Sequence, residues 1–321
     1  MTQQWDLTAV GDVNADLIMA EPERPPTLGQ EILVKDAYLT LGGATSLLAA
    51  AAARLGLAVR MVGKVGDDYL GRSLIADLQA AGVDTSLIIV DPSLRTGITV
   101  SLTWPDDRAL VTYDGPIARL TAEEVPPAAF ENTRHLHVSS FFLQKALQPG
   151  CAGLFRRARE MGLTTSLDTG DDPADRWDSG LVEALGHVDV FFPNRREACQ
   201  IAQMSDPIAA LDRLAARIPT VAVKLGREGA IASIRGQRLR VGAFRVCPVD
   251  TTGAGDSFNA GFLRAYLRGL PAEECLLWGA AAGALSTTWL GGQSAQMTAA
   301  AVERLIASER GRVSVAHLQG P

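Results

Sequence analysis

Short runs of apolar and β-branched residues alternate with longer segments of helical composition along most of the chain. The short runs predict strands at Leu7–Val10, Val59–Val62, His135–Val138, Thr164–Leu167, Val188–Phe192 and Val221–Lys224. The longer segments between or after them predict helices at Thr45–Leu55, Leu70–Ala81, Gly150–Met161, Arg195–Ala202 and Ile208–Arg217. A final block is helical almost throughout, over Asp256–Arg268, Ala272–Thr288 and Thr298–Ser308. This alternation is typical of a mainly parallel sheet with helices on both faces.

Two segments, Glu31–Thr40 and Gly97–Tyr113, have strand character without a following helix, and turn residues such as Pro92 and those at 105–107 bound them. Strands of this kind do not easily join a parallel core, so they predict a small antiparallel sheet beside it. Such a sheet next to a cleft often acts as a lid that excludes water from a reaction. We therefore expect one α/β domain over residues 1–321, with lid strands within about 12–40 and 95–115.

The composition narrows the class of protein. With 321 residues, 47% of them hydrophobic, the chain can bury a large core. A formal net charge of −6 argues against a general nucleic-acid binder, whose affinity needs a positive field. The four cysteines are scattered, so neither a disulfide framework nor a zinc site is expected. With neither a leader-like start nor a long apolar run, we expect a cytoplasmic protein without a membrane partner.

The strongest chemical signal is Asp-Thr-Thr-Gly-Ala-Gly-Asp at 250–256, directly before a predicted helix. A turn of small residues at a helix start points several unpaired N–H groups the same way, and with the helix dipole they form an anion hole. Gly253, Ala254 and Gly255 are small enough for a phosphate to approach the backbone. Asp256 can then accept a hydroxyl proton while the amides stabilise a transferring phosphoryl group. The alternative is an ordinary helix start with glycines for packing; the complete motif favours the functional interpretation.

This motif, continued by Ser257 and Phe258, resembles the second signature of the ribokinase-like (PfkB) carbohydrate kinase family. Gly42-Gly43, with the Ala-rich segment ending at Gly56, resembles the first signature, and the resemblance extends from Gly11 to about Gly292. It implies a three-layer α/β/α ribokinase-like fold and an ATP- and Mg²⁺-dependent kinase that phosphorylates a sugar hydroxyl. The chain has no Walker-type GxxxxGK[ST] motif and no GxGxxG after its first strand.

Carried over residue by residue, the resemblance makes Asp256 the general base and Gly253, Ala254 and Gly255 the anion hole. Asn194 and Glu197 match an NxxE motif associated with the nucleotide phosphates and Mg²⁺, with Glu197 acting through water. Asn194 could also be a plain N-cap, but its place after a strand, at the edge where α/β sheets bind ligands, favours the functional interpretation.

Further positions on the nucleotide side follow from the same resemblance. Lys224, Gly226 and Gly229 match a strand and turn that contact the nucleotide. Lys224 either reaches a phosphate or is a solvated strand end, and the two glycines also suit the turn itself. In some family members a monovalent cation such as K⁺ lies behind the anion hole, at positions that match Asp250, Thr252, Ser286 and Gly291.

On the substrate side, Asn14 and Asp16 match the family's sugar-binding first strand. Two residues apart on an extended segment, they point the same way, and an amide beside a carboxylate suits adjacent hydroxyls. The other substrate candidates are the glycines of the first signature, which allow close approach, two residues of the lid, and the end of a strand whose loop resembles the family's substrate loop: Gly42, Gly43, Arg95, Tyr113 and Asp168. The lid residues touch ligand or only brace strands.

The sequence departs from the family pattern at several places. Leu47 replaces the asparagine of the first signature, so either the substrate has an apolar or missing group there, or Thr45 or Ser46 makes the polar contact. Ala280 replaces a polar residue near the adenine, which leaves base specificity open. In the substrate loop, Gly170 and Asp172 stand where Asn and Arg are common.

Three functions remain in view. The leading one is an ATP-dependent kinase of a sugar or sugar derivative. The second is a nucleoside kinase on the same scaffold, which the apolar Leu47 would suit. The third is a non-catalytic nucleotide- or metabolite-sensing protein, which would not require a base beside an anion hole. An exposed lid sheet also offers an edge for a homodimer.

Overall fold

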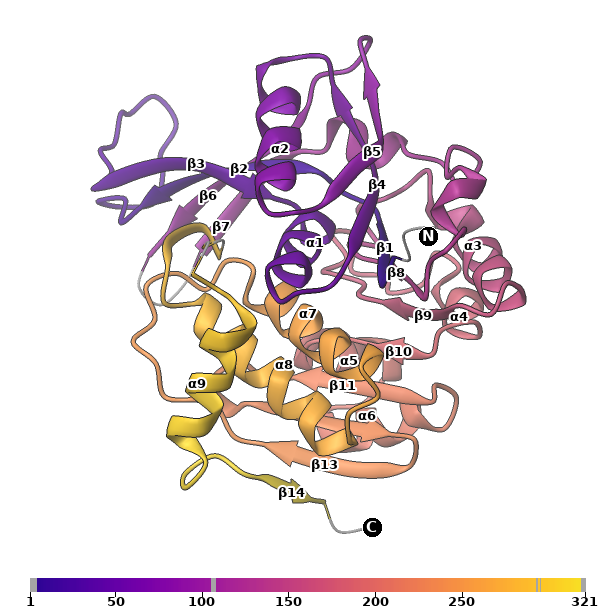
Figure 1. Ribbon diagram of the computed structural model, residues 1–321. Coiled ribbons are helices and arrows are strands. Elements are labelled where there is room, and N and C mark those ends of the chain that lie inside the picture. Colours follow the sequence, from indigo (N-terminus) through magenta and orange to yellow (C-terminus); the bar gives the residue numbers. More distant parts are fainter. Residues whose placement is uncertain (1–4, 105–107, 293, 295, 319–321) are drawn as a thin grey trace.

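A computed structural model describes residues 5–104, 108–292, 294 and 296–318. Within this part of the chain, a ten-stranded sheet forms the centre of the molecule (Figure 1). Its parallel part has, in spatial order, β11 (Thr220–Lys224), β10 (Val190–Phe191), β9 (Thr164–Leu167), β8 (His135–Val138), β1 (Leu7–Val10), β4 (Val59–Gly66) and β5 (Asp84–Asp91). Three antiparallel strands extend it beyond β11: β12 (Ala230–Ile234), β13 (Gln237–Val241) and β14 (Val315–His317).

Helices cover both faces of this sheet, which confirms the expected three layers. One face packs against α1 (Ala44–Arg54), α2 (Tyr69–Ala80), α7 (Ala254–Leu267), α8 (Ala272–Ser286) and α9 (Ala299–Glu309). The other packs against α3 (Gln148–Glu160), α4 (Leu181–Leu185), α5 (Arg195–Ala202) and α6 (Pro207–Ala215). Side chains alternate between the two faces along β1, so Ala9 belongs to the first hydrophobic core and Val10 to the second.

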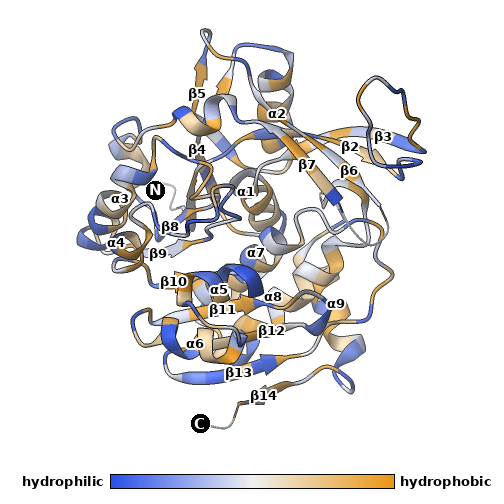
Figure 2. Ribbon diagram, turned by 180° about the vertical axis from the view of Figure 1, so that it is seen from behind, coloured by the Kyte–Doolittle hydropathy of each residue, from blue (hydrophilic) through white to orange (hydrophobic). Residues whose placement is uncertain are grey.

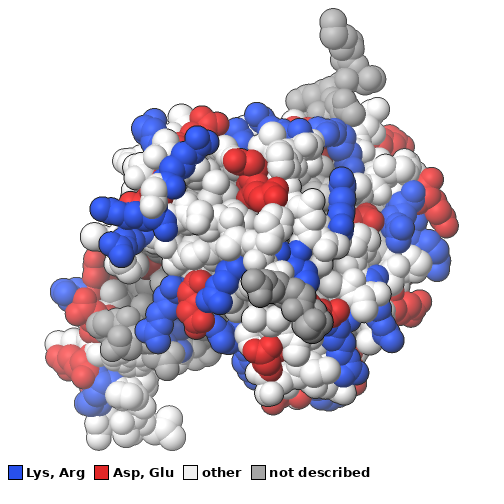
Figure 3. Space-filling model, turned by 90° about the horizontal axis from the view of Figure 1, so that it is seen from below, with Lys and Arg blue, Asp and Glu red and all other residues white. Residues whose placement is uncertain are grey.

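The surface pattern matches this layering. Figure 2 shows the strands β10, β11 and β12 largely in the hydrophobic colour, with hydrophilic positions on β13 near the edge of the sheet. On the face seen from below, basic and acidic side chains are interspersed (Figure 3). No helix of the described residues combines the length and apolar character needed to cross a bilayer.

The lid is a separate four-stranded sheet in the described chain, with the order β3 (Asp36–Gly42), β2 (Asn14–Ala20), β6 (Gly97–Thr103) and β7 (Arg108–Tyr113). Its outer pairs are antiparallel, as expected, whereas the central strands β2 and β6 pair in parallel. The strand expected from Glu31 begins later, at Asp36, and the turn expected at 105–107 lies outside the described residues. Figure 1 shows this sheet projecting from the side of the molecule beside α2.

Directly opposed residues in the lid share a face, so its register separates polar from apolar side chains. One face carries Asn14 and Asp16 of β2, with Thr99 of β6 and Thr112 of β7 opposite Asp16 in succession. The other carries an apolar row that crosses all four strands, made by Leu39, Leu17, Val100 and Val111. The polar face is the one that contributes to the site described next.

Candidate active site

Helix α7 begins without a side-chain cap. Gly253 is its N-cap, has a left-handed φ of 71°, and supplies no capping side chain. The amides of a helix's first turn have no acceptor within the helix, so those of Gly255 and Asp256 remain available to an anion. The backbone turn requires glycine at 253, since other residues rarely adopt this φ. The structure thus forms the geometry expected for an anion hole, with Asp256 in the same turn.

Lys224, at the end of β11, lies against this helix start. A Cβ atom added to Gly255 would lie 3.5 Å from the Lys224 Nζ, so the ammonium borders the anion hole. The same Nζ donates to Asp168 Oδ2 at 2.6 Å, and Asn259 Nδ2 donates to that oxygen at 2.6 Å. Gly170 N donates to Asp168 Oδ1 at 3.0 Å. The end of β9, the end of β11 and the first turns of α7 therefore meet at one point.

Charge crowding perturbs this cluster. Burial, and then the Asp168 carboxylate, raises the pKa of Asp256 well above its ordinary value, against the opposing effect of Lys224. Burial alone would also raise the pKa of Asp168, but Lys224 outweighs it and the pKa is lowered. The pKa of Lys224 is raised, because Asp168 and Glu197 more than offset its burial. A carboxyl group with a raised pKa beside fixed donors is the usual setting of a general base.

Asn194 and Glu197 form the expected NxxE pair at the start of α5. They make a reciprocal capping box: Glu197 N donates to Asn194 Oδ1 at 3.0 Å, and Asn194 N donates to Glu197 Oε2 at 2.7 Å. Asn194 is therefore an N-cap, as one interpretation of the sequence held. Burial, and then Asp168, raises the pKa of the Glu197 carboxyl to about 7. Lys224 N donates to Pro193 O at 2.9 Å, which brings this motif beside the Lys224 cluster.

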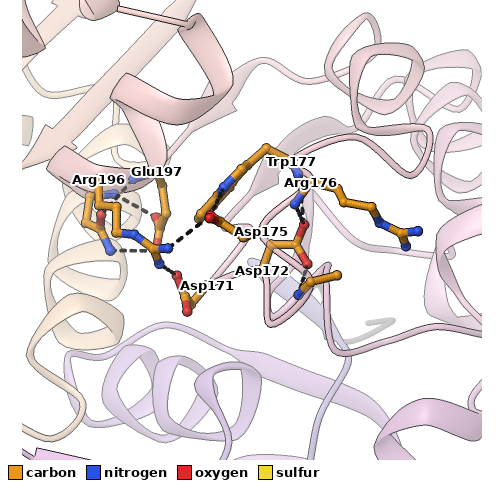
Figure 4. Close-up of polar contacts among 9 residues, drawn as sticks. Asp171, Asp172, Asp175, Arg176, Trp177, Arg196 and Glu197 are labelled. Atoms are coloured by element: carbon orange, nitrogen blue, oxygen red, sulfur yellow. Dashed lines mark hydrogen bonds and ion pairs between the residues drawn. The ribbon is translucent and has the colours of Figure 1, made fainter. Parts of the chain in front are cut away.

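The loop after β9 is fastened to α5 near Glu197 (Figure 4). Arg196 pairs with Asp171 and with Asp175, the latter at 3.1 Å. The buried Asp172 accepts from the backbone N–H groups of residues 174, 176 and 177 at 2.8–2.9 Å. Burial would raise the pKa of Asp172, but these amides outweigh it and the pKa is lowered. Asp172, which stands where relatives have arginine, thus shapes this loop.

The two glycines of the β11–β12 turn differ in their surroundings. Gly229 has a φ of 90°, and a Cβ there would lie 2.1 Å from Val241 O, so backbone packing alone requires glycine. Gly226 has a φ of 60° and open space where a Cβ would be. Gly226 is therefore the one that leaves room for a ligand next to the backbone.

The substrate candidates Asn14 and Asp16 lie on the polar face of the lid and meet Gly42. Asn14 Nδ2 donates to Asp16 Oδ1 at 3.0 Å and to Thr99 Oγ1 at 2.8 Å, while the buried Asn14 Oδ1 has no partner in the described residues. A Cβ on Gly42 would lie 2.1 Å from Asp16 Cγ, so glycine is required for this close approach. Burial raises the pKa of Asp16 to about 6.

Two other substrate candidates are placed differently. Tyr113 is opposite Ile98, on the face of the lid away from Asn14 and Asp16. Its neighbour Thr112 occupies the polar face instead, because side chains alternate along a strand. Arg95 lies in the loop before β6 with its side chain exposed, and a Cβ on Gly66 or on Gly115 would meet its backbone. The structure does not gather Tyr113 with the Asn14–Asp16 pair.

Asp12, which the sequence analysis did not single out, caps α1. Its carboxylate accepts from Ala44 N and Thr45 N at 2.9 Å each, from Thr45 Oγ1 at 2.6 Å and from Ser140 Oγ at 2.9 Å. Gly43, the N-cap of α1, has a φ of 85° and supplies no side-chain cap. Asp12 lies 32 residues before Ala44 in the sequence, so no local pattern points to this contact.

The first-signature departure at Leu47 gives a buried apolar side chain on α1, with 4% of its surface exposed. The hydroxyl of Thr45 is donated to Asp12, and that of Ser46 to the backbone carbonyls of Gly42 and Gly43. Both donors proposed as substitutes are therefore already used. This favours a substrate with an apolar or missing group next to Leu47. Ala280 is likewise buried, on α8.

The four residues matched to a monovalent-cation site lie around one loop. Asp250 Oδ2 accepts from Gly291 N at 2.9 Å and Asp250 Oδ1 from Thr252 N at 2.9 Å. Ser286, which donates to Gly283 O, directly precedes Thr287, whose carbonyl accepts from Asp250 N at 3.1 Å. Tyr38 of the lid also donates to Asp250, at 3.1 Å. The loop before the anion hole is thus joined to the lid.

The chain is similar to known kinases over most of its length. Residues 5–299 match the description "pfkB family carbohydrate kinase". The chain is 34% identical over 304 residues to the ATP-dependent ribose-1-phosphate kinase of Halopiger xanaduensis, covering 94% of this chain and 98% of that enzyme. It is 31% identical over 278 residues to the nucleoside kinase of Methanothermobacter thermautotrophicus, covering 86% of this chain and 87% of that enzyme.

A solved structure supports the same fold. The ribokinase of Arabidopsis thaliana, complexed with ribose and ATP, has a TM-score of 0.79 at 23% identity, and the match covers 95% of this chain and 99% of that one. The family match spans both glycine-containing motifs, the lid strands and the cluster around Asp256. The chain therefore belongs to the pfkB family of carbohydrate kinases.

Proposed function

We propose that this carbohydrate kinase transfers the γ-phosphoryl group of ATP to a sugar hydroxyl, with Asp256 as the general base. The observation that carries the assignment is the uncapped start of α7, where Asp256 shares a turn with free amides and Lys224 borders Gly255. Asp256 takes the hydroxyl proton, while the amides and the ammonium stabilise negative charge on the phosphoryl group. The Halopiger relative at 34% identity is described as ATP-dependent, which supports ATP as the donor.

The residues around Glu197 suit a magnesium ion that accompanies the nucleotide. Asp168 raises the pKa of both Glu197 and Asp256, and Lys224 lowers the pKa of all three carboxyl groups. A divalent cation would reduce this excess of negative charge. Mg²⁺ keeps most of its waters, so Glu197 would hold it through water, while Asn194 and Gly226 would face the phosphates. When bound, the ion neutralises charge on the phosphates.

A monovalent cation such as K⁺ would lie in the loop formed by Asp250, Thr252, Ser286 and Gly291. The hydrogen bonds that join these residues support the proposal, because they hold the loop in one shape directly before the anion hole. Asp250 supplies a buried negative charge there. Kinase activity compared in potassium and in sodium salts tests it; equal activity in both would contradict it.

The substrate is a sugar or a sugar derivative with adjacent hydroxyls. Asp16 offers an acceptor, and Asn14 keeps a buried carbonyl oxygen without a partner among the described residues. Gly42 and Gly43 let a sugar approach the backbone, and Arg95 would touch the ligand from the lid. The apolar Leu47 of the first signature also suits a nucleoside, whose ribose has the same diol. The relatives include a ribose-1-phosphate kinase and a nucleoside kinase, so both classes belong in a substrate panel.

The lid further supports a homodimer. Its outer face carries the row Leu39, Leu17, Val100 and Val111, of which Leu39 is 49% and Val111 64% exposed. Exposed apolar faces of this kind mark contact surfaces. The apolar face, rather than the sheet edge, would therefore meet a second copy.

The assignment of the base is tested by Asp256→Asn. We expect turnover, measured as ADP release over the substrate panel, to fall roughly 10²- to 10⁴-fold, because a positioned base contributes about that much. Binding of MgADP, measured by calorimetry, should remain within about threefold of the native value, since Asn keeps the shape and the amides. A variant with native turnover would sink the assignment, and ATP-independent activity of the native protein would sink the choice of donor.

A further inference from the structure

We propose that Asp168 and Asn259 are positioning residues that hold the Lys224 ammonium at the anion hole and away from the base. This rests on the proposed function, and it replaces the expectation that Asp168 contacts the substrate. Asp168 and Asn259 are both buried, and both Asp168 oxygens already accept hydrogen bonds from protein donors.

The hydrogen bonds of Asp168 are all directed at the protein. Its Oδ2 accepts from Lys224 Nζ and from Asn259 Nδ2, both at 2.6 Å, and its Oδ1 accepts from Gly170 N at 3.0 Å. The Oδ1 of Asn259 has no partner in the described part of the chain, so its defined polar contact is the one with Asp168. Both carboxylate oxygens are thus used in fixing a neighbour.

Lys224 needs such a fixed partner because other carboxylates compete for it. Glu197 and Asp256 both act on its ammonium, from the nucleotide side and from the base. A lysine side chain has four rotatable bonds and loses roughly 2 kcal/mol of rotamer entropy when it is held in place. If the ammonium moved to Asp256, it would pair with the group that has to accept the proton. The bond to Asp168 holds it at Gly255 instead.

Asn259 connects this arrangement to the base. It lies three residues after Asp256 on α7, so the two side chains share one face of the helix. Through Asn259, Asp168 and then Lys224, the position of the ammonium is defined relative to the same helix that carries the base and the amides. Three segments far apart in sequence therefore behave as one rigid unit, as preorganised charge stabilisation requires.

The test compares pH–rate profiles of kcat/KM for Asp168→Asn and Lys224→Met with the native enzyme. The groups acting on Asp256 are Asp168, Lys224, Asp12 and Asp16. Removing the Asp168 charge lowers the pKa of Asp256, so the acidic limb should move to lower pH. Removing the Lys224 charge raises that pKa, so the limb should move to higher pH. Loss of packing alone would not produce shifts of opposite sign.

Two further readouts complete the experiment. We expect Asp168→Asn to lower kcat/KM for ATP roughly ten- to hundredfold and Asn259→Ala roughly three- to tenfold, with KM for the sugar nearly unchanged. The exposed Asp178→Asn, in the same loop, is the matched control and should leave all values unchanged. Thermal melts identify variants that fold, and the isosteric Asp168→Asn carries the test if Asn259→Ala does not.

Other results would overturn the proposal. A raised KM for the sugar, with native kcat/KM for ATP and an unshifted acidic limb, would make Asp168 a substrate contact. Limbs of both variants that move in the same direction would also contradict it. Failure of the base assignment is recognised separately, because it appears as activity in Asp256→Asn. Weaker calorimetric binding of a non-hydrolysable MgATP analogue by Asp168→Asn would still support the positioning role in that case.

Discussion

At the scale of single residues, the site depends on carboxyl groups whose neighbours set different ionisation states. Burial raises the pKa of Asp16 to about 6 and that of Glu197 to about 7, whereas Lys224 holds the pKa of Asp168 below its ordinary value. The ionisation state of Asp16 directly affects its proposed role, since a sugar hydroxyl forms a stronger hydrogen bond to an ionised acceptor. The affinity for sugar should therefore weaken as the pH falls through about 6.

We expect KM for the sugar to rise as the pH falls through about 6, because protonation removes the Asp16 charge. Asp16→Asn should raise this KM roughly ten- to hundredfold at about pH 8 and flatten its pH dependence. Asp36→Asn, exposed on the neighbouring strand β3, is the control. Steady-state kinetics between about pH 5 and 8 measure both, and an unchanged KM in Asp16→Asn at the upper end would contradict the role.

At the scale of elements, strands β8 and β9 carry a buried chain of polar side chains through the centre of the sheet. His135 bridges Thr164 and Ser166, at 2.7 and 2.6 Å, and His137 bridges Ser166 and Ser139, at 2.6 Å each. Burial lowers the pKa of His137 to about 3 and that of His135 well below 6.5. Both rings are therefore neutral in the folded protein, where each nitrogen has a hydroxyl partner.

The two buried histidines predict how the free energy of unfolding changes at acidic pH. A histidine with a depressed folded pKa contributes stability that is complete above about pH 6.5 and is lost as the pH falls towards about 3, because the unfolded state binds protons first. The contribution of His137 to the free energy of unfolding should fall by about 2 kcal/mol between about pH 7 and 5. In denaturant unfolding, the free energy of unfolding of His137→Gln should therefore fall correspondingly less over this pH range. The exposed His317→Gln should show the same fall as the native protein.

The comparison must be made between variants. Glu197 and Asp16 have raised pKa values, so their contributions to stability grow as the pH falls over the same range, and they mask the histidines in the total. Nitrogen-15 NMR of the native histidine rings is a second measurement. A ring of His137 that becomes charged near pH 6 would contradict the prediction.

At the scale of the whole molecule, the lid is a sheet with two functions on its two faces. Its polar face carries Asn14 and Asp16. Tyr38 of β3 approaches Asp250 in the loop before α7, and Thr40 approaches Gly291 in the turn after α8. On its apolar face, Leu39 and Val111 are exposed with respect to the rest of the described residues. A second copy that covers this face would fix the lid strands, so assembly and substrate binding would be linked.

We expect the native protein to be a dimer and the double variant Leu39→Asp with Val111→Asp to be a monomer, because charges on an apolar contact face are costly to bury. Sedimentation velocity over a concentration series measures this. Val182→Asp, at an exposed apolar position on α4, is the control and should leave the dimer intact. A native protein that sediments as a monomer throughout the series would contradict the proposal.

Local patterns predicted much of this fold. The bounds of β1, β8 and β9 follow the apolar runs, and every predicted helix is present within a few residues of its expected ends. Strand β5 and the hairpin β12–β13 were missed, because the first lies in a segment of mixed polarity and the second in a segment assigned to nucleotide contacts. The hairpin turn at Arg235-Gly236, with φ values of 49° and 85°, was a usable signal.

The residues of the site also differ in how well the sequence predicts them. Residues within one motif, such as Gly253 to Asp256, were predictable because their relation is set by a helix start. The contact among Asp168, Lys224 and Asn259 joins three distant segments, and no local pattern specifies it. Tyr113 shows a further limit: strand register decides which of two neighbours faces the site, and the alternation alone does not fix that choice.

Two helix starts meet near the reacting centre, and the chain treats them differently. At α1 the amides of Ala44 and Thr45 are bound by Asp12, whereas at α7 Gly253 leaves the amides open. Because Asp12 belongs to the same chain, its carboxylate competes for the α1 amides at a much higher effective concentration than a free anion. We therefore expect a phosphate group to bind at the start of α7 rather than at the start of α1.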